Sequence, residues 1–201
     1  MAFALDALVR DFGQGIEAVD ARRPQAVNSR SGKPFQVGLG PHTEIDTVEL
    51  VMRELATSAP AVYEGKYSTS VPYPEDTRSK CDLCLGRGPD YDLAVEVKMA
   101  RILGDNGKPN DNLVMHMLSP YPTHRSALTD CIKLQGTNLS SRRAVIVYGY
   151  EAEGFPLQPL IEAFELLARH SVSLGQRHSA RFSGLVHPVH ASGSVYGWEV
   201  S

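Results

Sequence analysis

The sequence predicts an α/β fold in which a mixed central sheet is flanked by helices, within a single domain of 201 residues. The first observation is the order of patterns along the chain: helix, helix, strand, hairpin, helix, strand, helix and closing strands. The second is the continuous apolar run Ala144–Tyr148, which is typical of a strand buried on both faces. A strand of that kind needs helices on both sides of its sheet.

In the first third of the chain, apolar residues at helical spacing predict an amphipathic helix over residues 3–20. A long loop rich in basic residues, Ser, Gly and Pro follows over 21–43. A second helix is predicted to begin near Thr43 or Asp46, either of which could cap it, and to end before Pro60. Its expected buried residues are Ile45, Val48, Met52 and Leu55.

In the middle of the chain, residues 61–73 predict a strand that ends in a loop, and a β-hairpin follows over 81–98. Residues 103–120 predict a loop interrupted by the apolar piece Leu113–Leu118. A third helix is expected to start near Pro122 and Thr123. The residues expected on or near one face of it are Ala127, Leu128, Cys131, Ile132 and Gln135.

The last quarter of the chain predicts a helix over 157–169 and a closing hairpin over 178–200. In the helix, Ile161, Phe164 and Ala168 recur at helical spacing.

Composition limits the cellular setting and the class of partner. The three cysteines are an odd number and form no disulfide framework, so we expect a reducing, cytoplasmic location. No apolar run approaches the ~20 residues of a membrane helix, and the amino terminus lacks the basic start of a secretory signal. A net charge of −3 disfavours non-specific coating of nucleic acid but allows a local basic cleft.

The predicted hairpin contains the most informative residues of the chain. Its first strand contains Asp82, and its second ends in Glu96-Val97-Lys98. Side chains two apart in a strand share a face, so Glu96 and Lys98 point the same way. Two acids beside a lysine on rigid strands can bind a divalent metal and polarise a water, which is the chemistry of phosphodiester hydrolysis.

Three residues compete as the acid that accompanies Glu96. Asp90 lies in the turn, at the entrance of the strand, and Asp92 lies ~13 Å away along the same strand. Asp82 fits best, because a register pairing residue 82 with residue 96 sets their Cβ atoms ~4.5–5.5 Å apart and sets Cys84 opposite Ala94. A slip of one residue would send Asp82 to the other face.

An acid on one strand, a turn, and then Glu-x-Lys on the next strand resembles the PD-(D/E)XK nuclease superfamily. The resemblance implies a restriction-endonuclease-like core of helix, three-stranded meander, helix and strand over about residues 44–150. The amino-terminal helix and the carboxy-terminal helix plus hairpin would be additions to it.

The resemblance also implies a site for Mg²⁺, for which Mn²⁺ may substitute, held by Asp82, Glu96 and the carbonyl of Val97. Lys98 would orient the attacking water and help to deprotonate it. Many members add an acid from the preceding helix, for which Glu44 and Glu49 are the candidates and Glu44 is preferred.

The resemblance implies hydrolysis of DNA by an endonuclease of the restriction or DNA-processing type, with no membrane partner. A homodimer is expected, because cleavage of a duplex needs two sites or two successive events. The expected DNA contacts are Arg30, Lys33, Arg101, Arg125 and Lys133. The alternatives are a non-catalytic DNA-binding or assembly module with the same fold and a nuclease that acts on RNA.

Overall fold

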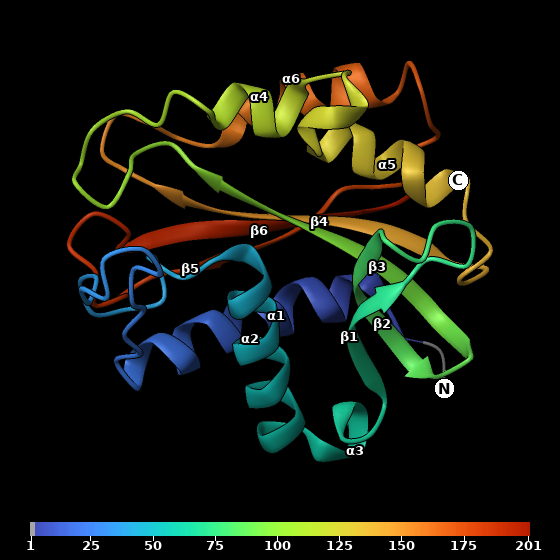
Figure 1. Ribbon diagram of the computed structural model, residues 1–201, viewed down its shortest axis with the longest axis horizontal. Coiled ribbons are helices and arrows are strands. Elements are labelled where there is room, and N and C mark those ends of the chain that lie inside the picture. The colour runs from blue at the N-terminus through green and yellow to red at the C-terminus, as the bar shows by residue number, and fades with distance from the viewer. Residues whose placement is uncertain (1–2) are drawn as a thin grey trace.

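The computed structural model describes residues 3–201 and has three layers, with one sheet between two layers of helices (Figure 1). The helices are α1 (Leu5–Ala21), α2 (Glu44–Ser58), α3 (Pro60–Tyr63), α4 (Leu113–Leu118), the 3₁₀ turn η1 (Pro122–His124), α5 (Ala127–Gln135) and α6 (Gln158–Ala168). The strands are β1 (Tyr67–Pro72), β2 (Lys80–Arg87), β3 (Asp90–Arg101), β4 (Arg143–Glu151), β5 (His178–Phe182) and β6 (Ser192–Glu199). The α/β class and the mixed sheet flanked by helices are therefore confirmed.

The six strands form one sheet in the order β1-β2-β3-β4-β6-β5. Strand β4 runs parallel to β3, and the other neighbours are antiparallel. The parallel pair needs a crossover, and the segment that contains α4 and α5 supplies it.

Each face of the sheet has its own apolar core. Helices α1 and α2 cover one face through residues such as Phe12, Ile16 and Met52. Helices α4, α5 and α6 cover the other through residues such as Leu134 and Phe164. Strand β4 contributes buried side chains to both cores, as its continuous apolar run predicts. Among the described residues, no helix has the length and apolar character needed to cross a membrane.

Helix α2 begins where its cap predicts, because the Thr43 side chain accepts a hydrogen bond from the Asp46 amide at 3.2 Å. The expected burial of Ile45 is wrong, since this side chain is 53% exposed and Val51 is buried instead. Position 45 lies in the first turn of α2, away from the core.

Two further segments differ from the prediction. Residues 61–63 belong to the short helix α3, and the strand begins only at Tyr67. Helix α5 begins at Ala127, after a cap by Ser126, rather than near Pro122. Its buried face includes Asp130 and Leu134, while the expected Ile132 and Gln135 are exposed.

Strands β2 and β3 separate at one end and form a fork. Their pairing runs from Arg87 opposite Asp90 to Leu83 opposite Val95, and Cys84 lies opposite Ala94. Beyond Leu83, strand β2 continues with β1, to which Cys81 is paired, while β3 continues with β4. The second half of β3 therefore has an open edge.

Candidate active site

A pocket of about 570 Å³ lies at the fork between β2 and β3. Its acidic residues are Glu44, Asp82, Glu96 and Asp130, and its basic residues are Arg78, Lys80, Lys98, Arg125 and Lys133. They come from α2, β2, β3, α5 and the loops beside them. The pocket thus gathers acids and bases from across the sequence at the point where the sheet opens.

Two of the acids bind the open edge of β3. An oxygen of Asp82 accepts the Val97 amide at 2.8 Å, and an oxygen of Glu44 accepts the Met99 amide at 2.6 Å. Strand β2 no longer pairs with β3 at this point, so without these two acids the amides would have no hydrogen-bond acceptor from a neighbouring strand. In a strand, the carbonyl of a residue points to the same side as its amide, so the Val97 carbonyl is also on the side of Asp82.

Glu96 lies one residue beyond the last β2–β3 pair and is only 2% exposed. One of its oxygens accepts a hydrogen bond from the Tyr73 hydroxyl and pairs with Lys133 Nζ at 2.7 Å. Burial, and next the nearby carboxylate of Asp82, raise the pKa of Glu96 well above its usual value. The surroundings of Glu96 therefore disfavour its ionised form.

Lys98 is held between two carboxylates. Its ammonium lies 3.0 Å from Asp130 Oδ2 and 3.3 Å from Glu44 Oε1, and its side chain is 12% exposed. Burial lowers the pKa of Lys98, but the charges of Asp130 and Glu44 outweigh burial, and the pKa is raised overall. Lys98 is therefore a fixed positive charge in this pocket.

The pKa of Glu44 is raised to about 7, chiefly by burial and also by the charges of Asp82 and Asp130. Lys98 and the Met99 amide oppose that rise. Glu44 therefore changes charge near neutral pH.

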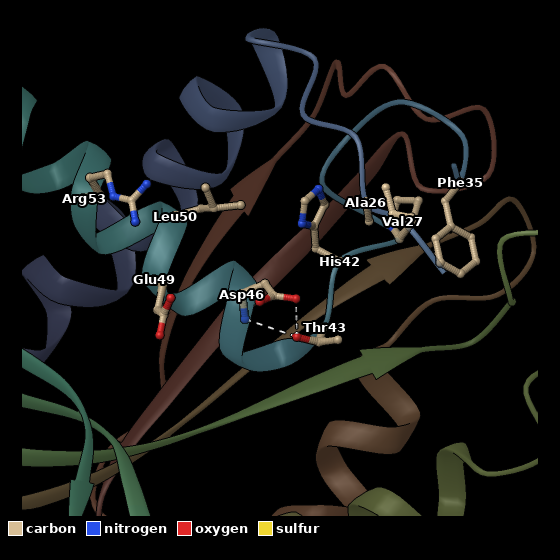
Figure 2. A pocket seen from close by; sticks show the side chains of 10 residues that line it. Ala26, Val27, Phe35, His42, Thr43, Asp46, Glu49, Leu50 and Arg53 are labelled. Carbon is tan, nitrogen blue, oxygen red and sulfur yellow. Dashed lines mark hydrogen bonds between the residues drawn. The ribbon is translucent and has the colours of Figure 1, made fainter. Parts of the chain in front are cut away.

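Glu49, the other candidate acid of α2, faces a different pocket. That pocket measures about 350 Å³ and lies between α2 and the loop that precedes it (Figure 2). Glu49 is exposed there, in the same group of side chains as Leu50 and Arg53 (Figure 2). The alternative acids Asp90 and Asp92 do not line the fork pocket either.

The expected DNA contacts fall into two groups. Arg125 and Lys133 line the fork pocket, and Arg125 is exposed. Arg101 does not line it, because its guanidinium pairs with Asp105 at 3.2 Å. Arg30 and Lys33 are exposed on the loop before α2 and do not line the pocket either.

Sequence reasoning missed Asp130 and Tyr73. Asp130 pairs with Lys98 and Lys133, and the Tyr73 hydroxyl donates a hydrogen bond to Glu96. One signal for Asp130 was available, since an acid three residues before Lys133 shares a helix face with it. Nothing in the local pattern around Tyr73 indicated its contact with Glu96.

A second group of polar side chains lies away from the fork. Asp105, His187 and His190 offer ligand atoms within 4.8 Å of one another, so they could bind a metal ion. The two imidazole rings are stacked with 18° between their planes, and His187 Nδ1 accepts the amides of Val189 and His190. A ring would have to turn for both lone pairs to meet one ion.

Comparison with known proteins found no matching family model, no matching curated protein and no matching solved structure. The geometry of the site offers four carboxylates in one pocket, the ammonium of Lys98 between two of them, and further cations at the pocket.

Proposed function

We propose that this chain is a metal-dependent nuclease that hydrolyses phosphodiester bonds of DNA. The observation that carries the proposal is the meeting of Asp82, Glu96 and Lys98 in one pocket at the fork of β2 and β3. Carboxylates and a lysine held on adjacent strands are the groups that metal-assisted phosphodiester hydrolysis needs.

The order of elements supports a restriction-endonuclease-like core within this fold. Helix α2 precedes the meander β1-β2-β3, then α5 and β4 follow, and β4 lies parallel to β3. This is the arrangement that the PD-(D/E)XK resemblance implies. Helix α1 and the segment from α6 to β6 are then additions to that core.

The donor set fits Mg²⁺ or Mn²⁺, which prefer oxygen ligands. Asp82, Glu96 and Glu44 would hold the ion, together with the Val97 carbonyl. Burial first, and then the neighbouring carboxylates, raise the pKa of Glu44 and Glu96, while Lys98 lowers that of Glu44 and Lys133 lowers that of Glu96. A divalent cation would offset the repulsion between these carboxylates. When bound, it would polarise a water and stabilise charge on the phosphate.

Lys98 has a defined part in this reaction. Because Asp130 and Glu44 keep it charged, its ammonium orients the attacking water and the phosphate as a hydrogen-bond donor. This refines the expectation that Lys98 helps to deprotonate the water, since a lysine with a raised pKa is a poor base.

The substrate proposed from the charge distribution is a nucleic acid backbone. Arg78, Lys80 and Arg125 line the same pocket as the acids and are exposed to solvent. Exposed cations beside the reacting groups can hold the phosphates that flank the scissile bond.

Incubation of supercoiled plasmid with Mg²⁺ tests the proposal. Wild-type protein should nick or linearise the plasmid, and Asp82→Ala and Lys98→Met should each lower the rate by about 10²-fold or more. Glu44→Gln should also slow cleavage, whereas Glu49→Gln, on the same helix but outside the fork pocket, should cleave at the wild-type rate. Circular dichroism should show that each variant is folded.

The same assay separates the alternatives. If wild type and the folded variants all leave plasmid, single-stranded DNA and RNA intact, the nuclease proposal is wrong. Retained DNA binding in that case would support a binding or assembly module. Cleavage of RNA but not of DNA would support the proposed hydrolysis and show that the substrate is RNA.

A further inference from the structure

Lys133 lies against the carboxylate of Glu96 in the fork pocket. Its ammonium lies 2.7 Å from Glu96 Oε1 and 3.3 Å from Asp130 Oδ1, and 5.1 Å from the centre of the Tyr73 ring. Lys98, by contrast, pairs with Glu44 and Asp130. Lys98 and Lys133 therefore share Asp130 as a partner, but of these two lysines it is Lys133 that pairs with Glu96.

The same Glu96 oxygen also accepts the Tyr73 hydroxyl, so it already has a donor and a cation. A divalent ion bound to that carboxylate would stand within a few ångströms of the ammonium, and two cations at that distance repel strongly in a buried site. The ion and the Lys133 ammonium therefore compete for Glu96.

We propose that Lys133 is a resident counter-ion that neutralises Glu96 in the metal-free protein and must withdraw before a divalent ion can bind there. This inference rests on the proposed function, because it concerns the metal site of the same pocket. Lys133 is a positioning residue in this sense, and it sets the metal concentration at which the site fills.

The surroundings of Lys133 allow that withdrawal. Its side chain is 33% exposed, compared with 12% for Lys98, and it projects from α5 into a pocket of about 570 Å³. A lysine has a long flexible stem, so its ammonium can leave Glu96 while the helix stays in place. The released ammonium would remain in the pocket that the phosphate enters.

Titration of the metal-free protein with Mn²⁺, followed by the paramagnetic resonance signal of the free ion, tests the inference. Lys133→Met should bind Mn²⁺ about tenfold more tightly than wild type, because the competing charge is gone. Lys133→Gln keeps a hydrogen-bond donor for Glu96 and should show the same direction. It also serves as the second variant if Lys133→Met does not fold.

Lys80→Met is the matched control, since Lys80 lines the same pocket but forms no ion pair with its acids. This substitution should change Mn²⁺ affinity by about twofold or less, because Lys80 is exposed and solvent screens its charge.

Thermal unfolding gives a second readout. Metal-free Lys133→Met should melt below wild type, because Glu96 is left without its counter-ion, and saturating Mn²⁺ should raise its melting temperature more than that of wild type.

The outcomes separate this inference from the proposed function. Unchanged or weaker Mn²⁺ binding by both Lys133 variants, with Asp82→Asn abolishing binding, would overturn the resident counter-ion and leave the metal site standing. Absence of Mn²⁺ binding in wild type and in every variant would overturn both. A lowered melting temperature without tighter Mn²⁺ binding would show that Lys133 only supports the fold.

Discussion

Glu44 should make the stability of the metal-free protein depend on pH. Its pKa rises from 4.5 to about 7, chiefly because it is buried. Between these values the folded protein binds more protons than the unfolded chain, so the free energy of unfolding falls as pH rises. The contribution is fully present below about pH 4.5 and is lost once the pH passes about 7.

Urea denaturation of metal-free wild type and Glu44→Gln at several pH values between 4.5 and 8 measures this effect. The stability of wild type relative to Glu44→Gln should decrease across the interval, since glutamine does not titrate. Glu49→Gln should run parallel to wild type. A wild-type curve parallel to that of Glu44→Gln would mean that Glu44 does not titrate in this range.

At the residue scale, the sequence could predict the groups that lie on one hairpin. Asp82, Glu96 and Lys98 reach one pocket because strand alternation and a single register bring them together. Asp130 and Tyr73 could not be found in this way, because their contacts depend on where α5 and the segment after β1 pack. The stacked His187 and His190 likewise depend on a loop conformation that no local pattern specifies.

At the element scale, the turn between η1 and α5 places Arg125 at the pocket in a left-handed conformation with φ 48°. Glycine adopts this conformation at little cost, so Arg125→Gly removes the cation and keeps the turn. We expect its free energy of unfolding to stay the same or rise by up to about 1 kcal/mol. Its DNA binding should weaken, and the slope of log affinity against log salt should fall by about one.

Arg23→Gly is the control for Arg125→Gly. Arg23 is also an exposed arginine with positive φ, 57°, but it lies after α1 and does not line the fork pocket. Its replacement should leave the salt dependence of DNA binding, measured by fluorescence anisotropy, unchanged. Equal effects of the two substitutions would mean that Arg125 contributes only to net charge.

The elements themselves were predictable where the pattern was long or capped. Helix α1 has apolar residues throughout at helical spacing, and α2 has Thr43 as its cap. The errors concern short segments and helix ends, where few residues define a face. Ile45 and Ile132 are apolar yet exposed, and both line the fork pocket. The local pattern predicted that these two side chains belong to the core, whereas they lie at the candidate site.

For the whole molecule, the two halves of the sheet are joined through β4 and β6. Gly193 on β6 allows the close approach of these strands, because a Cβ at this position would lie 2.0 Å from the Gly149 carbonyl oxygen and 2.5 Å from Phe182 Cζ. The neighbouring atom is backbone, which cannot move aside without breaking the β4–β6 register. That register links the fork at β2 and β3 to the carboxy-terminal strands.

Gly193→Ala should therefore lower the free energy of unfolding by about 3 kcal/mol or more, measured from its urea midpoint. Gly136→Ala is the control, because a Cβ there would meet its nearest atoms at 3.8 Å and the backbone is right-handed, so its midpoint should stay within about 0.5 kcal/mol of wild type. Because the acids of the pocket depend on β3 being held by β4, Gly193→Ala should also lose Mn²⁺ binding as it unfolds. A wild-type midpoint for Gly193→Ala would contradict the close packing of β4 against β6, and with it the continuous six-stranded sheet.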